Sequence, residues 1–252
     1  MRYIEKIIGK YGLRMACEIR FFFGWGWYAA PVCDKLVVKS IIQAQAKRDR
    51  TMAATTVFDV ADALLERAPG RRLETLKLQK LCFYVFGWYA HQTGAALFDE
   101  RFYAMPKGPV VGELLSAHAG KAAFSQEQLG KQFDEHDLDR DGLDLYVDEI
   151  VDAVWRCYGK LNAGELVDLT HEEQVWIDAW EHRPEGARRG DLSQEEIVGY
   201  FLHRRFTSFE EEKLDLPDSQ VTFVDADWLS ELDSRDDLIS EEFIADVVAA
   251  LR

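Results

Sequence analysis

The chain has 252 residues, a formal net charge of −15, and 48% hydrophobic and 12% aromatic side chains. This composition is typical of a folded globular protein and excludes a disordered chain. The excess of carboxylates also argues against nonspecific nucleic-acid binding, because a phosphate backbone attracts cations and repels anions.

The four cysteines are Cys17, Cys33, Cys82 and Cys157, and none lies in a C-x-x-C pair. Their spacing indicates neither a zinc site nor a disulfide framework, and it favours a cytoplasmic location.

The charge is distributed unevenly along the chain. Residues 1–51 hold ten Lys/Arg and four Asp/Glu, whereas residues 207–252 hold three and fourteen. The apolar stretch "FFFGWGWYAAPVC" in the basic part is too short for a membrane span of about 20 residues, and no A-x-A cleavage site follows it cleanly. We interpret residues 1–51 as an extension upstream of a start at Met52, with a membrane-associating leader as the alternative. Residues 52–206 are then a helical domain, and residues 207–252 an acidic C-terminal segment with a final helix.

From Met52 onward, apolar residues recur at the i, i+3, i+4 spacing of helices that pack by one face. The spacing predicts a helix from Thr56 or Asp59 to the "APGRR" turn. Further helices are predicted at about 74–91, 111–118 and 145–158. The alternation in "RFYAMP" predicts a short strand, which "KGPVV" should break, and residues 125–144 form a polar separator.

The stretch "LTHEEQVWIDAW" begins at Leu169 and contains one histidine beside two glutamates. A zinc-protease helix would need a second histidine at position 175, which is Val175. Thr170 followed by Glu173 instead predicts a capping box that opens a helix. Ser193 with Glu196 predicts a second capping box after the basic loop "RPEGARRG".

Beyond these helices, "QVTFVDADW" predicts a short strand and "SEEFIADVVAAL" the final helix. The predicted fold is mainly α: a single helical domain with a small antiparallel β element.

The segment "DLDRDG" (137–142) has the first acidic positions of a calcium-binding EF-hand loop. Its twelfth position is Asp148 where a bidentate glutamate is required, and there is no second copy. We interpret it as a solvated acidic loop that caps the next helix. The sequence also has no nucleophile elbow, phosphate loop or Cys/His signature, so we assign no catalytic residue, no metal and no cofactor.

A second face of the predicted helix 74–91 carries Lys77, Lys80, Tyr84 and Trp88. Aromatic residues beside cations on one stripe are typical of a protein-binding hot spot. We expect this stripe, extended by Lys107, to be solvent exposed and to bind a partner. The alternative is that another helix of the same domain covers Tyr84 and Trp88.

Two blocks of sequence resemble the Panacea domain, found in GepA-like phage-associated proteins and SocA-like antitoxins. The first block reads "LKLQKL" from Leu76, then Tyr84, Gly87-Trp88 and "GPVV" from Gly108. The second block is "GELVDLTHEEQVWIDAW", with its Thr-His-x-x-x-x-Trp pattern. Together they span about 57–206, so residues 52–206 form a Panacea-like domain. The segment Met105-Pro106-Lys107 departs from the family pattern and puts partner identity in question.

The resemblance implies an antitoxin that binds and neutralises a co-encoded toxin. In the SocA-like branch, antitoxins can act as adaptors that deliver the toxin to the ClpXP protease, which implies ClpX as a second partner. It also implies that His171 and Glu172 present or shape a partner surface. No small-molecule substrate, nucleic acid or membrane is expected. Two alternatives remain: a hydrolase that uses His171 with a carboxylate, and a DNA-binding autorepressor.

Overall fold

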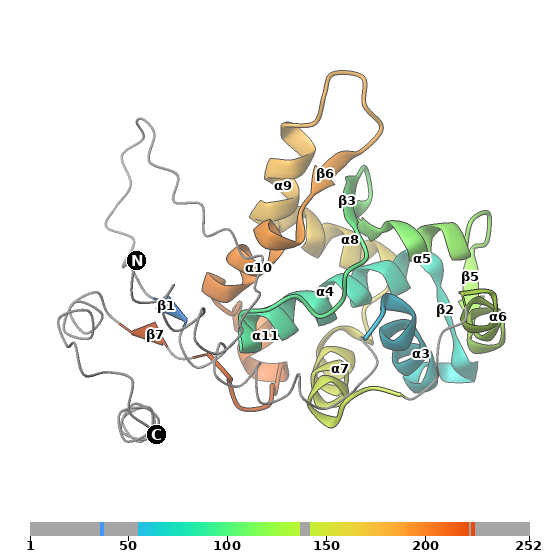
Figure 1. Ribbon diagram of the computed structural model, residues 1–252, viewed down its shortest axis with the longest axis horizontal. Helices are drawn as coiled ribbons and strands as arrows, with labels where there is room; N and C mark the ends of the chain where they lie inside the picture. The colour runs from blue at the N-terminus through green and yellow to red at the C-terminus, as the bar shows by residue number, and fades with distance from the viewer. Residues whose placement is uncertain (1–35, 38–54, 137–141, 222, 225–252) are drawn as a thin grey trace, which may run out of the picture. The chain divides into compact units, whose positions relative to one another are not determined.

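The computed structural model describes residues 36–37, 55–136, 142–221 and 223–224, and the chain divides into two compact units (Figure 1). The described part of the first unit, 1–38 with 222–252, is one antiparallel pair. It joins β1 (Leu36–Val37) to β7 (Phe223–Val224), with Leu36 opposite Val224. The second unit, 39–221, contains the rest of the described structure.

The second unit is built around α4 (Thr75–Thr93), in which every residue from Leu78 to Trp88 is buried. A helix that is apolar nearly all round must be covered on all sides. Four helices provide that cover. They are α3 (Val57–Arg67), α7 (Leu145–Tyr158), α8 (Ala163–Glu172) and α10 (Gln194–His203).

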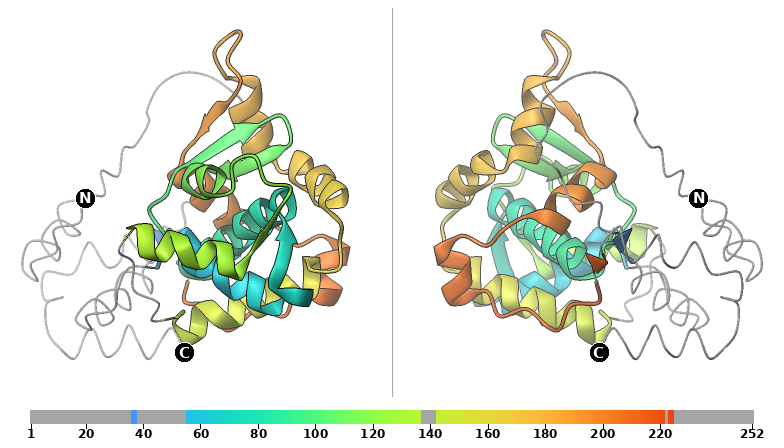
Figure 2. Two further views of the ribbon diagram at one scale, coloured as in Figure 1. Left: turned by 90° about the vertical axis from the view of Figure 1, so that its right-hand side faces the viewer. Right: turned by 90° about the vertical axis from the view of Figure 1, so that its left-hand side faces the viewer.

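Two small antiparallel sheets complete the described part of the unit, where the sequence predicts a small antiparallel β element. In the larger sheet, β3 (Phe102–Met105) lies between β4 (Gly108–Val111) and β6 (Gly190–Leu192), with Phe102 opposite both Val111 and Leu192. In the smaller one, β2 (Arg72–Glu74) pairs with β5 (Ala123–Ser125). The larger sheet lies at one end of the unit and α7 at the other (Figure 2). The mainly α fold class is confirmed.

The strand predicted in "RFYAMP" ends at Met105, as expected, but the sequence did not predict that Gly108–Val111 of "KGPVV" turn back as a second strand, β4. Pro109 has no backbone N–H to donate. It is tolerated because β4 is an edge strand, whose outer side pairs with no other strand. The polar separator 125–144 is also more ordered than expected. It contains α6 (Gln126–His136), whose Phe133 packs edge-on against Phe58 at 6.4 Å.

The helix after the acidic loop is capped by Asp144, two residues beyond that loop, whose side chain accepts a hydrogen bond from Tyr146 N at 3.0 Å. Residues 137–141 lie outside the described residues, and so does the predicted final helix.

The capping box at Thr170 and Glu173 is wrong. Asn162 and Glu165 form the capping box that opens α8, and Thr170 lies in its last turn, where its hydroxyl donates to Val167 O at 3.0 Å. Glu173 separates α8 from α9 (Gln174–Glu181). The second predicted capping box, Ser193 with Glu196, is confirmed at the start of α10.

The remaining elements are short. They are a 3₁₀ turn at Pro69–Arg71, α5 (Gly112–Ala117) and α11 (Ser208–Lys213). The α11 segment begins beyond residue 206 and belongs to the second unit, which continues to Val221. Its buried Glu210 is one of the charges of the core.

Candidate functional site

The expectation that the stripe faces solvent is wrong, and the alternative, that the same domain covers Tyr84 and Trp88, is confirmed. Lys80 and Trp88 have no exposed surface, Tyr84 retains 1%, and Lys77 is half-buried. Tyr158 of α7 stacks on Tyr84 and bonds to Trp88, and Phe201 of α10 packs against Trp88. The Lys77 ammonium donates to the carbonyls of Gly159 and Leu161, both at 2.7 Å, which satisfies the end of α7. These polar groups are tolerated inside because each finds an internal partner.

Lys80 is the most unusual of these residues because no carboxylate forms an ion pair with it among the described residues. Its Nζ donates to the carbonyl of Pro109 at 2.7 Å. Burial lowers the pKa of Lys80 from 10.5 to about 7. A buried ammonium is costly and a neutral amine is not, so the environment favours the uncharged form.

Gln79, the next residue, holds the same strand from α4. Its Oε1 accepts from Val111 N at 2.8 Å, and its Nε2 lies 3.3 Å from Val111 O and 3.0 Å from His118 Nε2. The side-chain amide therefore takes the place of a neighbouring strand at the edge of β4, and this fixes β4 to α4.

Gly108 shows how tightly these segments meet. Its φ is +93°, and a Cβ at this position would lie 2.5 Å from Thr170 Oγ1 and 2.9 Å from Lys80 Nζ. Only glycine fits both the backbone conformation and the space. We refer to Gln79, Lys80, Gly108, Pro109 and Thr170 as the signature clamp, because it joins both family-like blocks.

His171 lies beside the clamp and stacks on Trp176 with a centroid distance of 4.0 Å. Trp176 in turn donates to Met105 O at 3.3 Å, which ties α9 to the end of β3. Burial and the nearby Lys80 lower the pKa of His171, while a hydrogen bond to the Pro106 backbone opposes that shift. The imidazole therefore favours its neutral form.

The His171 ring holds the β3–β4 turn and has no hydrogen-bonded carboxylate among the described residues. Its Nε2 is buried and makes no hydrogen bond to any described residue. A hydrolase that uses His171 with a carboxylate would need the two groups within hydrogen-bond reach, and the described residues show no such pair. Lys107 and Glu172 are exposed near this ring. We refer to Pro106, Lys107, His171 and Glu172 as the turn surface.

A buried ionic cluster lies on the other side of Tyr84 and Trp88. Arg204 Nε donates to Glu173 Oε2, and Arg204 Nη1 donates to Glu210 Oε2, both at 2.8 Å. The three side chains are 10%, 4% and 3% exposed. The Arg204 guanidinium also lies 4.9 Å from the centre of the Trp88 ring.

Tyrosines complete this ionic cluster. Tyr200 donates to Glu173 Oε2 at 2.7 Å, and Tyr158 donates to Glu210 and accepts from Trp88 Nε1 at 3.1 Å. Burial would raise the pKa of Glu210, but hydrogen bonds from Arg204, Thr207 N and Tyr158 lower it overall. Sequence reasoning missed this cluster because Arg204 follows the end of α10 and Glu173 lies far from it in the chain, although the Thr207–Glu210 capping spacing was visible.

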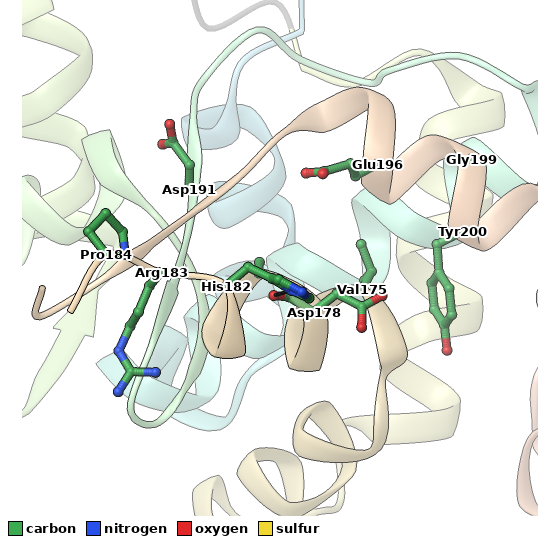
Figure 3. A pocket seen from close by; sticks show the side chains of 10 residues that line it. Val175, Asp178, His182, Arg183, Pro184, Asp191, Glu196, Gly199 and Tyr200 are labelled. Atoms are coloured by element: carbon green, nitrogen blue, oxygen red, sulfur yellow. Dashed lines mark hydrogen bonds between the residues drawn. The ribbon is translucent and has the colours of Figure 1, made fainter. Parts of the chain in front are cut away.

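A pocket of about 600 Å³ lies between α9, β6 and α10 (Figure 3). Its walls include Val175, Ala179 and Tyr200, and three carboxylates come from three different elements. Those carboxylates are Asp178 on α9, Asp191 on β6 and Glu196 on α10. Sequence reasoning missed the pocket, because residues so far apart in the chain show no common spacing.

Comparison with known proteins gives one match. The model of the family described as "Antitoxin SocA-like, Panacea domain" matches residues 78–177. No curated protein and no solved structure matches the chain. The described residues include no helix with the length and apolarity of a membrane span, and no group of three His, Cys, Asp or Glu side chains placed to hold a metal.

The matched range begins at Leu78, near the start of α4, and ends within α9. It contains the whole signature clamp together with His171 and Glu172. The resemblance seen in the sequence is thereby confirmed, because residues 78–177 match the model of the SocA-like antitoxin Panacea domain.

Proposed function

We propose that this protein is an antitoxin that binds a co-encoded protein toxin in the cytoplasm and neutralises it by direct contact. The observation that carries the proposal is the match of residues 78–177 to the SocA-like antitoxin domain, which supports an antitoxin-type role. The proposal adds a protein partner and a mode of action to that role.

The placement of the family-like residues separates a buried scaffold from the surface that would bind the toxin. Lys80, Gly108, Pro109 and Thr170 are buried, and they hold α4, the β3–β4 hairpin and α8 together. Residues that are buried in this way cannot contact a partner directly. They build the scaffold, and the surface that the scaffold presents would select the toxin.

The turn surface is one such region. Lys107 and Glu172 are exposed, and the ring of His171 is held in place beneath them by Trp176. A turn supported by a stacked ring and by the clamp is rigid, which reduces the entropy lost on binding. Of the residues expected to bind a partner, Lys107, His171 and Glu172 therefore keep that role in the proposal.

The experiment is co-expression with the product of the neighbouring open reading frame, scored by growth and by pull-down. Wild-type protein should restore growth and retain the product. Lys107→Glu and Glu172→Lys should weaken retention, because reversed rim charges slow association. Glu195→Lys on α10, also exposed, is the matched control. Failure of the wild-type protein to bind or to restore growth would contradict the antitoxin function.

Delivery to ClpXP is a separate part of the proposal and rests on the SocA-like resemblance. The same co-expression in cells without ClpX distinguishes the two modes. Loss of neutralisation there, together with a longer toxin half-life, would support an adaptor. Unchanged neutralisation would contradict delivery and leave neutralisation by direct contact.

A further inference from the structure

We propose that the pocket between α9, β6 and α10 receives an arginine or lysine side chain from a basic segment of the toxin. This inference rests on the proposed antitoxin function for the source of that side chain. The recognition chemistry itself follows from the shape and charge of the pocket.

The pocket has the size and walls for a long aliphatic side chain. Its volume of about 600 Å³ lies within the usual range for ligand pockets, roughly 300–1,000 Å³. Val175, Ala179 and the Tyr200 ring provide apolar contact surface. Lysine and arginine bury their methylene stems against such surfaces while the charged end stays near polar groups.

The charged groups of the pocket favour a cation. Asp178, Asp191 and Glu196 are all exposed and come from the three elements that enclose the space. Asp178 accepts one hydrogen bond from Gln174 at 2.7 Å, and Glu196 accepts one from Ser193 N at 3.0 Å. A carboxylate has about four acceptor positions, so both retain capacity for an incoming donor.

Three carboxylates and one arginine line the pocket, so an excess of negative charge remains. Arg183 donates to Trp180 O, and its guanidinium lies 3.6 Å from the centre of the Trp180 ring. In Figure 3 its side chain extends from the end of α9 on the side opposite Glu196. The Nδ1 of His182, which also lines the pocket, lies 2.8 Å from Asp178 O.

Gly199 provides an independent observation. It lies inside α10, where glycine costs about 1 kcal/mol relative to alanine. A Cβ at Gly87 or Gly190 would collide with Phe201 or with Ala179, so packing explains those glycines. A Cβ at Gly199 would meet no atom within 4 Å. Packing therefore does not explain Gly199, which leaves the α10 wall of the pocket open for a ligand.

The test uses the full-length protein and N-acetyl-arginine amide as the probe, followed by NMR. Addition of the probe should shift the resonances of Val175, Ala179 and Gly199 saturably, while N-acetyl-glutamine amide should not. Gly199→Leu should fill the pocket and abolish the shifts. Gly199→Ala, the matched control, should retain them. Asp191→Asn should weaken binding by about fivefold, as expected for an exposed ion pair.

Both glycine variants should be at least as stable as the wild type, because leucine and alanine are better helix formers. Loss of binding in Gly199→Leu alone therefore reports the pocket. Absence of arginine-dependent shifts in the wild type, or equal shifts in Gly199→Leu, would overturn the proposal. These titrations contain no toxin, so their failure leaves the antitoxin function standing. If the titrations succeed but the co-expression fails, the pocket binds a basic side chain that does not come from a toxin. That outcome overturns the part of the proposal that names the toxin.

Discussion

The interior of this protein contains charged side chains, of which Arg204, Glu173 and Glu210 form one cluster. Arg204 lies between Glu173 and Glu210, so the cluster contains one cation and two carboxylates. Hydrogen bonds from Tyr158 and Tyr200 offset the excess negative charge. Such a cluster is stable as a whole, but removal of one member leaves another buried charge without its partner.

Glu210→Ala should therefore lower the free energy of unfolding by about 3 kcal/mol or more. It would also remove the cap acceptor of Thr207 N, at 2.8 Å. Urea denaturation monitored by circular dichroism measures the change. Glu212→Ala on the same short helix is the exposed control and should stay within about 0.5 kcal/mol. Equal effects of the two substitutions would show that the ionic cluster contributes little.

Lys80 should make stability depend on pH. Its pKa is about 7 in the folded protein and 10.5 when unperturbed, so between these values the unfolded chain binds a proton that the folded chain does not. Stability should consequently rise with pH above about 7, by at most about 1.4 kcal/mol per pH unit. Below pH 7, Lys80 is protonated in both the folded and the unfolded chain. The full cost of burying its ammonium group then lowers the free energy of unfolding.

The measurement is the free energy of unfolding from pH 6.5 to 8.5 for wild type and Lys80→Met. The difference between them isolates Lys80, because other titrating groups such as Cys82, whose pKa burial raises, contribute to both. The wild type should gain stability relative to the variant as the pH rises. Parallel curves would mean that Lys80 remains charged when buried.

At the scale of elements, the signature clamp joins α4, the β3–β4 hairpin and α8. Gln79 replaces a neighbouring strand for Val111, and Lys80 binds the Pro109 carbonyl. The hairpin is therefore held to the central helix by side chains at the edge of β4. The Trp176 contact with Met105 O adds α9 to the same assembly.

Gly108→Ala should disrupt this assembly because the added Cβ meets Thr170 and Lys80 at a positive φ. We expect a loss of about 3 kcal/mol from backbone strain and overpacking together. Gly120→Ala is the matched control, since Gly120 also has a positive φ of 72° but nothing within 4 Å. That variant should lose only about 1 kcal/mol. Thermal denaturation compares the two, and similar midpoints would argue against the clamp.

At the scale of the whole molecule, the second unit contains all the contacts that build the proposed surfaces. Its first described helix, α3, is capped by Thr56 and held by a hydrogen bond from Val57 N to Glu100 at 3.1 Å. These contacts begin after Met52. The residues expected to form an N-terminal extension lie mostly outside the described residues.

A chain that begins at Met52 should keep the fold of the second unit. Its thermal midpoint should lie within about 2 °C of the full chain, because no described contact of that unit is removed. Toxin binding in the co-expression assay should also be retained. A chain that begins at Val57 is the informative comparison, since it lacks the Thr56 cap and should lose about 1 kcal/mol. Loss of folding in the longer chain would show that residues 1–51 contribute to the core.

Local interactions explain what the sequence determined by itself. The helix 145–158 and the Ser193–Glu196 capping box depend on residues three or four positions apart, and the structure confirms them. The mainly α fold class follows from the same short spacings. The family-like blocks were also readable, because residue identity and order suffice to recognise them.

Only the tertiary structure decided which polar residues are inside. Lys80 is buried and Lys77 half-buried, and carbonyls of Pro109, Gly159 and Leu161, which lie 29 to 84 positions away in the chain, accept their hydrogen bonds. A helical pattern cannot show such partners, so the stripe was read as exposed. The ionic cluster of Arg204 and the pocket at Gly199 could not be predicted for the same reason. Each combines elements that come together only when the chain packs.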